Sequence, residues 1–169
     1  MKTYFISGGA GFIGSNFIRS LLKTNCKIVN LDLLTYAASL STINEFKKNK
    51  NYSFVKGNIL DKKKIKGIFK KYKPDMVINF AAETHVDRSI DEPENFINTN
   101  ILGVFNLLNN SLDYWKSSIK KNFKFIQIST DEVYGSISKG KTNENSNLLP
   151  NSPYSASKTS ADHLLLAYK

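Results

Sequence analysis

A tyrosine and a lysine four residues apart form the first pair that could do chemistry. Tyr154 and Lys158 belong to the segment YSASK, and this spacing places both side chains on one face of a helix. A free tyrosine has a pKa of about 10, so it is a poor base at neutral pH. A nearby ammonium and a bound cationic ring would both stabilise the phenolate. The pair therefore predicts a tyrosine base for a substrate hydroxyl, with an ordinary exposed pair as the alternative.

Two adjacent carboxylates offer a second reactive group. Asp131 and Glu132 come shortly after an apolar segment that is expected to form a strand. Neighbouring carboxylates repel each other, which raises the pKa of one of them. Such a pair suits a reaction that needs a separate acid and base. The alternative is a solvated turn without a chemical role.

A glycine-rich segment predicts a dinucleotide site. GGAGFIG, residues 8–14, lies between the first expected strand and the first expected helix. Glycine permits the tight turn there and lets a pyrophosphate approach the N–H groups at the positive end of the helix. Asp32, at the end of the second strand, would bind ribose hydroxyls and repel a 2′-phosphate, which favours NAD over NADP. A structural turn and a capping aspartate are the alternatives.

Alternating elements must position these residues. Strands are expected over residues 3–7, 27–31, 52–55, 76–80 and 123–128, and helices over 12–23, 39–48, 61–72, 94–115 and 152–169, with a polar loop over 135–150. Asp61 can cap the third helix, and Pro153 lies in the first turn of the last. Such alternation predicts an α/β fold, a doubly wound parallel sheet of the Rossmann type with both faces covered.

Composition excludes several classes of protein. The 169 residues, 41% of them hydrophobic, suffice for about one domain with a real core. The single cysteine, Cys26, cannot form an internal disulfide and indicates the cytoplasm. No apolar run approaches the ~20 residues of a membrane span. The net charge is +10, and one run of lysines is interleaved with Ile65, Ile68 and Phe69 at helical spacing. This pattern favours a solvated helix face over a nucleic-acid surface.

The motifs together resemble one enzyme family. The matching stretches are GGAGFIG (8–14), LTYA (34–37), AAETHVDRSI (81–90), NTN (98–100), STDEVYG (129–135) and SPYSASK (152–158). They resemble the N-terminal part of the dTDP-glucose 4,6-dehydratases, in the extended short-chain dehydrogenase/reductase superfamily. The triplet Thr130-Asp131-Glu132 is the most specific, because sister epimerases usually carry a serine-rich segment there.

The resemblance implies an activity and a role for each catalytic residue. The reaction would be the NAD-dependent conversion of dTDP-glucose to dTDP-4-keto-6-deoxyglucose, as in the biosynthesis of rhamnose and other deoxysugars. Tyr154 would deprotonate the 4-hydroxyl while C4 gives hydride to NAD. Glu132 would remove the C5 proton, Asp131 would protonate the departing 6-hydroxyl, and hydride would return to C6. Thr130 would bind the sugar O4, and Lys158 would bind the nicotinamide ribose.

The same resemblance implies a set of cofactor-binding residues. They are Gly8, Gly11, Phe12, Ile13, Gly14, Asp32, Leu33, Leu34, Thr35, Asn58, Ile59, Phe80, Ala81, Ala82, Thr84, Thr99, Tyr154 and Lys158. Thr84 would also contact the substrate, beside Thr130, Asp131 and Glu132, and no metal site is implied. Three positions depart from the family pattern: Asn58 replaces an acid, Ala38 a glycine and Leu33 a frequent lysine. His85 is expected near the substrate pocket and not as a general base.

Residues 1–169 are expected to form one NAD-binding Rossmann domain that is cut short, because the last helical pattern has no terminating glycine or proline. Family members carry a further stretch of comparable length with a substrate domain, so this chain alone is expected to be inactive. The full-length enzyme would be a cytoplasmic homodimer that binds a nucleotide sugar. Two alternatives stay open: a non-catalytic NAD-binding or scaffold protein, and another nucleotide-sugar 4,6-dehydratase or epimerase.

Overall fold

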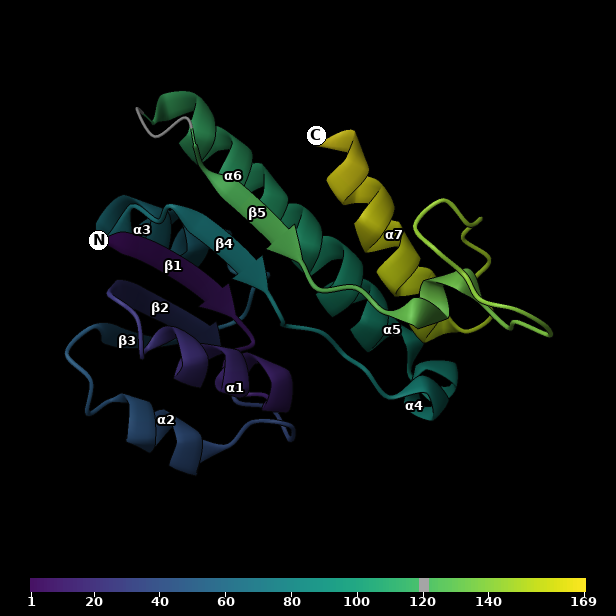
Figure 1. Cartoon of the computed structure of the whole chain (residues 1–169), viewed down its shortest axis with the longest axis horizontal. Helices are drawn as coiled ribbons and strands as arrows, with labels where there is room; N and C mark the ends of the chain where they lie inside the picture. Colours follow the sequence, from purple (N-terminus) through teal and green to yellow (C-terminus); the bar gives the residue numbers. More distant parts are fainter. Residues whose placement is uncertain (119–121) are drawn as a thin grey trace.

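The sheet has five parallel strands in the order β3-β2-β1-β4-β5 (Figure 1). The computed structural model describes residues 1–118 and 122–169. The strands are β1 (Lys2–Ser7), β2 (Cys26–Asp32), β3 (Tyr52–Lys56), β4 (Met76–Asn79) and β5 (Lys124–Gln127). The chain runs outward from β1 to β3, then crosses back to place β4 on the other side of β1. The carboxyl ends of β1 and β4 therefore flank the point where ligands bind in such sheets.

Helices cover both faces of the sheet, as the sequence predicts. The helical elements are α1 (Phe12–Leu21), α2 (Leu40–Phe46), α3 (Lys62–Tyr72), α4 (Val86–Asp91), α5 (Pro93–Phe96), the π-helix η1 (Ile97–Gly103), α6 (Val104–Ser117), the 3₁₀ turn η2 (Asp131–Tyr134) and α7 (Pro153–Ala167). Helices α1 and α2 lie on one face, and α3 and α6 lie on the other (Figure 1). In the described residues, no helix is long and apolar enough to cross a membrane.

Alternate residues of the central strands supply the two cores. Phe5 of β1 packs with Ile65, Ile68 and Phe69 of α3, whereas the next residue, Ile6, packs with Ile18 of α1. Successive side chains of a strand point to opposite faces. Continuous apolar runs such as residues 4–6 are therefore what a sheet covered on both faces requires.

Two helix starts follow from caps visible in the sequence. The Asp61 side chain accepts a hydrogen bond of 2.9 Å from the Lys64 N–H at the start of α3. At the start of α7, Ser152 and Ser155 each accept a hydrogen bond from the other's backbone N–H, and Pro153 occupies the first turn. These caps satisfy N–H groups that have no partner inside the helix.

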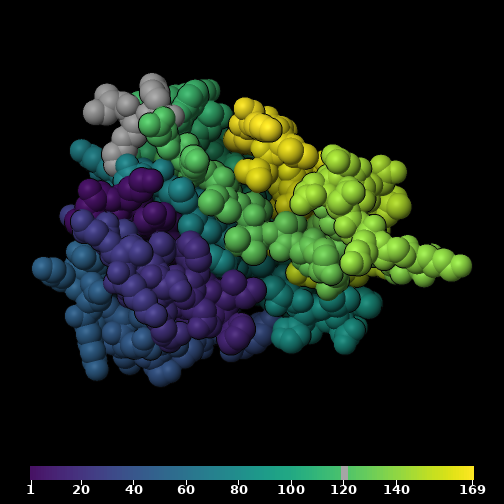
Figure 2. Space-filling view, in the orientation of Figure 1, coloured from purple at the N-terminus to yellow at the C-terminus, as the bar shows by residue number. Residues whose placement is uncertain are grey.

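The segments that follow β4 and β5 differ from expectation. The single helix expected over 94–115 is divided into α5, the π-helix η1 and α6. The short helices α4 and η2 were not expected at all. The Asn100 side chain, in the π-helix, forms hydrogen bonds with Glu83 in the loop after β4 and with Ser157 of α7. The segment between η2 and α7 projects from the molecule (Figures 1 and 2).

Candidate active site

Two glycines of the loop after β1 are required by the packing of the protein itself. Gly8 has φ of +75°, and a Cβ there would lie 2.4 Å from the backbone nitrogen of Ala81. A Cβ on Gly14 would lie 2.5 Å from the carbonyl oxygen of Gly8. The backbone thus leaves no room for a side chain at position 8 or position 14. The glycine loop and the segment after β4 form one wall of the site.

Gly11 has a different surrounding. A Cβ on Gly11 would meet no atom closer than the Gly8 oxygen at 3.5 Å, an ordinary contact. Gly11 nevertheless lines a cavity and is the N-cap of α1, where no side chain caps the helix. The space in front of Gly11 and the uncapped N–H groups behind it fit the phosphates of a dinucleotide.

The Asp32 carboxylate fixes two loops at the end of β2. One oxygen accepts a hydrogen bond of 2.8 Å from the Ala10 N–H in the glycine loop. The other accepts one of 2.8 Å from the Leu34 N–H, and Leu34 has φ of +62°. Asp32 therefore holds two loops and does not cap a helix, which was the alternative to cofactor binding. Each carboxylate oxygen can accept a second hydrogen bond, so these two bonds leave acceptors for a ribose hydroxyl.

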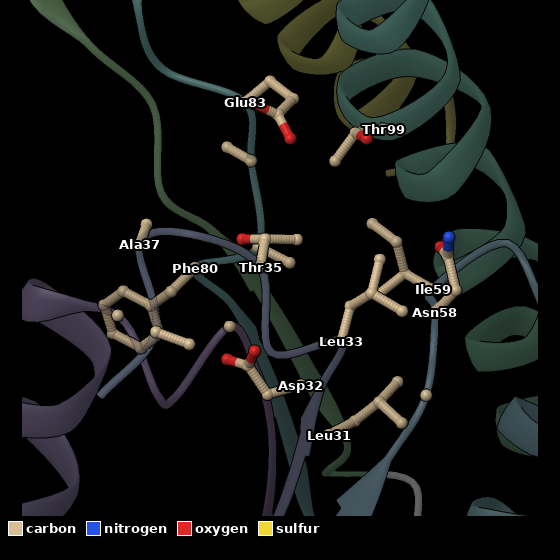
Figure 3. A pocket seen from close by; sticks show the side chains of 16 residues that line it. Leu31, Asp32, Leu33, Thr35, Ala37, Asn58, Ile59, Phe80, Glu83 and Thr99 are labelled. Atoms are coloured by element: carbon tan, nitrogen blue, oxygen red, sulfur yellow. The ribbon is translucent and has the colours of Figure 1, made fainter. Parts of the chain in front are cut away.

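The cavity lies along the carboxyl ends of β1 to β4 (Figure 3). Asp32 lies at one end, Glu83 and Thr99 lie at the other, and Thr35 lies between them. The predicted residues that line it are Gly8, Gly11, Asp32, Leu33, Thr35, Asn58, Ile59, Phe80, Ala81, Ala82 and Thr99. Residues from four separate loops thus meet in one hollow, as the spacing of the motifs requires.

Other predicted cofactor residues do not line this cavity. They are Phe12, Ile13, Gly14, Leu34, Thr84, Tyr154 and Lys158. Phe12 and Ile13 are exposed side chains of the first turn of α1. Sequence reasoning missed Leu31, Ala37, Ala38, Gly57 and Glu83, which do line it. Each lies within three residues of a predicted one, so extending the motifs along their loops would have found them.

Tyr154 is buried at the start of α7, and residues that follow β5 affect its pKa. Its ring packs edge-on against Phe96, with centroids 6.3 Å apart. Burial raises the pKa of Tyr154, a hydrogen bond with Thr130 lowers it, and the carboxylates of Glu132 and Asp131 raise it. The sequence argument expected a neighbouring ammonium to lower this pKa, whereas in the structure burial raises it and the lowering effect comes from the Thr130 hydrogen bond. Helix α7, which carries Tyr154, packs against η2, which contains Asp131 and Glu132 and is capped by Thr130.

The fifth catalytic candidate, Lys158, lies deeper. Its Nζ donates a hydrogen bond of 2.6 Å to the carbonyl oxygen of Ile128. Burial lowers the pKa of Lys158, and the carboxylate of Asp162 one helical turn later raises it. Asp162 in turn accepts a short hydrogen bond from Ser129.

A chain of polar side chains crosses the sheet to reach this lysine. Ser7 of β1 donates to Asn79 of β4 over 2.6 Å, and Asn79 donates to Gln127 of β5 over 2.9 Å. Gln127 donates over 3.2 Å to the same Ile128 carbonyl that holds Lys158. Ser7 and Asn79 are almost fully buried. Buried polar groups that satisfy one another fix their own geometry, so the strands help to place the lysine.

Asn100 connects the cavity to the tyrosine helix. Its side chain accepts a hydrogen bond from the Glu83 N–H and donates to the Glu83 carbonyl, each over 2.9 Å. The same side chain donates to Ser157 Oγ over 2.9 Å. Glu83 lines the cavity, and Ser157 lies between Tyr154 and Lys158 on α7. The π-helical turn that presents Asn100 therefore joins a loop that lines the cavity to the helix that carries Tyr154 and Lys158.

A family model described as GDP-mannose 4,6 dehydratase matches residues 5–169. The chain belongs to this family. It is 46% identical over 172 residues to a dTDP-glucose 4,6-dehydratase of Xanthomonas campestris, covering 99% of the chain and 49% of that relative. The chain thus spans about half the length of the curated relatives it matches, and its resemblance to their N-terminal part is confirmed.

Solved structures show the same fold. A dTDP-glucose 4,6-dehydratase of Bacillus anthracis in complex with NAD has a TM-score of 0.85 and 39% identity, covering 99% of this chain and 50% of that one. A UDP-Glc/GlcNAc 4-epimerase of Campylobacter jejuni has a TM-score of 0.90 and 30% identity, covering 99% and 49%. The predicted doubly wound parallel sheet is confirmed.

Proposed function

We propose that this chain is the NAD-binding half of a nucleotide-sugar 4,6-dehydratase that acts on dTDP-glucose. Residues 1–169 would form the cofactor domain, and the remainder of the protein would supply most of the nucleotide-sugar site. The relatives are dTDP-glucose 4,6-dehydratases twice as long as this chain, which supports the proposal. On the same basis we propose a cytoplasmic homodimer for the whole protein and no turnover by the 169 residues alone.

The residues of the cavity fit NAD. Gly11 leaves open space before the uncapped N-terminus of α1. Asp32 retains acceptors for ribose hydroxyls, and its negative charge disfavours a 2′-phosphate. When bound, NAD would supply the acceptor and later the donor of the hydride. Lys158, held at the Ile128 carbonyl, would bind the nicotinamide ribose.

The observation that carries the dehydratase proposal is the packing of η2, which contains Asp131 and Glu132, against α7, whose first turn contains Tyr154. Tyr154 would accept the proton of the 4-hydroxyl, with Thr130 binding O4. The resulting 4-ketone acidifies the C5 hydrogen, which Glu132 would remove. Asp131 would protonate the 6-hydroxyl as it leaves as water, and Glu132 would return a proton to C5. Two carboxylates beside each other suit this division into acid and base.

The same fold also supports epimerases, so the fold alone does not distinguish the two reactions. The Campylobacter jejuni epimerase has a TM-score of 0.90. The acid pair favours the dehydratase, because epimerisation at C4 needs a tyrosine base but no elimination of water. The higher identity to dehydratases, 46% against 30%, favours the same choice.

Product analysis of the full-length protein tests the proposal. With dTDP-glucose, we expect a product lighter by one water and carrying a 4-keto group, measured by mass spectrometry and NMR. A product of unchanged mass would indicate an epimerase instead.

Glu132→Gln should abolish water loss while NAD stays bound, and dehydration that persists in this variant would remove Glu132 as the base. NAD binding without any turnover would favour the non-catalytic alternative.

A further inference from the structure

One side chain connects two loops at the cavity and has no part in the proposed chemistry. Tyr36 lies in the loop between β2 and α2, whose neighbouring residues Thr35 and Ala37 line the cavity. Its phenol donates a hydrogen bond of 3.3 Å to Glu83, in the loop after β4. Glu83 lines the same cavity. Two loops that meet the cavity from different strands are therefore joined through one side chain.

Two further side chains hold the Tyr36 ring. The Arg88 guanidinium of α4 lies over the ring, with its carbon 4.9 Å from the ring centroid. The His85 ring lies against Tyr36 with the centroids 5.7 Å apart. Tyr36 thus contacts three residues from the segment that follows β4, although it is 55% exposed. A ring so exposed would rotate freely without these partners.

The contacts connect the loops after β2 and β4 on one side of the cavity. From Asp32 the chain runs through Thr35 to Tyr36, crosses to Glu83 through the side chain, and returns through Ala81 to the sheet. Strands β2 and β4 are separated by β1, so no backbone ladder ties these loops together. The contacts of Tyr36 therefore join these loops through side chains, and a dinucleotide that passed between the two loops would have to break them.

We propose that Tyr36, held by Glu83, Arg88 and His85, is a latch that retains the bound dinucleotide. This inference rests on the proposed NAD site and adds a residue that governs the rates of binding and release. A latch that is closed before the ligand arrives must open for entry as well as for exit. Its removal therefore accelerates both rates, whereas loss of a simple wall accelerates release alone.

The test is stopped-flow measurement of NADH fluorescence with this chain. Tyr36→Ala removes a cation–π contact and a hydrogen bond, so we expect release about tenfold faster than in the unsubstituted chain, with faster binding too. Tyr36→Phe keeps the ring over Arg88 and should release NADH about threefold faster. Leu40→Ala is the matched control, because Leu40 is exposed near the same loop and does not line the cavity; its rates should stay unchanged.

A second pair of variants isolates the Arg88 contact. Arg88 also pairs with Glu92 at 3.6 Å, so Glu92→Gln removes that pair and leaves the Tyr36 contact. Arg88→Gln should accelerate release, and Glu92→Gln should not. In the double variant Tyr36→Ala/Arg88→Gln, release of NADH should be no faster than in Tyr36→Ala. Both substitutions break the same contact, that of the Arg88 guanidinium with the Tyr36 ring.

Distinct outcomes would overturn the latch and the proposed cofactor site. Rates in Tyr36→Ala equal to those of the unsubstituted chain would overturn the latch alone. Faster release with slower binding would also overturn it, because that result describes a damaged wall. If the unsubstituted chain binds no NADH, the proposed cofactor site itself fails, and the latch fails with it.

Discussion

Glycines of one short loop have separate reasons to be glycine. Gly14 has no room for a Cβ, which would lie 2.5 Å from the Gly8 oxygen, whereas a Cβ on Gly11 would contact the protein normally. In the sequence, Gly11 and Gly14 are equivalent positions of the GGAGFIG motif, and nothing there distinguishes their roles. The distinction between a glycine required by packing and one required by a ligand emerges only from the distances.

This distinction predicts opposite behaviour for two alanine variants. Gly14→Ala should lower the free energy of unfolding by about 2 kcal/mol, because the loop and helix must separate. Gly11→Ala should keep the melting temperature but lose NADH affinity, because its methyl group enters the space before the helix N-terminus. Thermal melts and fluorescence titrations measure the two effects. Equal destabilisation by both variants, with equal affinity, would contradict this account.

The buried tyrosine at the start of α7 shows where residue-level reasoning was incomplete. The spacing of Tyr154 and Lys158 predicted one helix face, and both residues do lie on α7. The spacing could not show that Lys158 donates to the Ile128 carbonyl, or that burial dominates the pKa of Tyr154. Both effects depend on residues that follow β5, from Ile128 to η2, which approach α7 only in the folded chain.

At the scale of elements, the alternation of apolar and helical patterns predicted five strands and their parallel arrangement. It did not predict the division of the helix over 94–115, since a π turn leaves the apolar pattern on both sides nearly intact. The Tyr36 contact with Arg88 was also beyond prediction, because it joins loops after two strands whose relative places only the sheet order reveals. The contacts that the sequence did not predict lie mostly in the segments that follow the carboxyl ends of the strands.

The pairing of β2 with β3 contains a buried tyrosine whose ionisation should affect stability at alkaline pH. Asn30 of β2 donates a hydrogen bond of 2.8 Å to the Tyr52 hydroxyl of β3. Burial raises the pKa of Tyr52 to about 12, the Asn30 hydrogen bond lowers it, and the Asp32 charge raises it. The unfolded chain has the ordinary value of about 10. The folded state therefore binds this proton more tightly.

The sign of the pH effect follows from this difference. The stability contributed by the Tyr52 proton is fully present below pH 10 and is lost as pH rises from about 10 to about 12. Tyr52→Phe should be less stable at pH 7 by about 1 kcal/mol, for the lost hydrogen bond. Its stability should fall less steeply in the alkaline range. Urea unfolding at pH 7, 10 and 11 measures the free energy of unfolding of the unsubstituted chain and of Tyr52→Phe. An equal fall of this free energy with pH in the two proteins would contradict the prediction.

At the scale of the whole molecule, the described sheet ends at β5 beside an apolar groove. Strand β5 pairs with β4 alone among the described strands. The groove between α6, β5 and α7 is lined by Leu108, Ser111, Leu112, Trp115, Phe123, Phe125, Leu165, Leu166, Tyr168 and Lys169. Ile126 on the strand is 40% exposed. An open strand edge next to apolar surface promotes association.

We therefore expect this chain to self-associate as its concentration rises, and Ile126→Lys to reduce that association. A lysine on an edge strand opposes pairing by its charge. Sedimentation velocity over a range of concentrations measures the effect. Asn145→Lys adds the same charge on the projecting loop, away from the sheet edge, and should leave association unchanged. Equal sedimentation of all three proteins at every concentration would show that β5 is not the contact.

The hydrogen bonds of Asp32 also restrict how the cofactor preference of such a protein can evolve. The carboxylate that we propose excludes a 2′-phosphate also accepts hydrogen bonds from Ala10 in the glycine loop and from Leu34, which has a left-handed conformation. A mutation that removes the charge to admit NADP also releases both loops, so the first step toward the new cofactor weakens binding of either one. We expect a lineage to reach NADP only after other residues have come to support those loops, which makes NAD dependence a historically persistent trait.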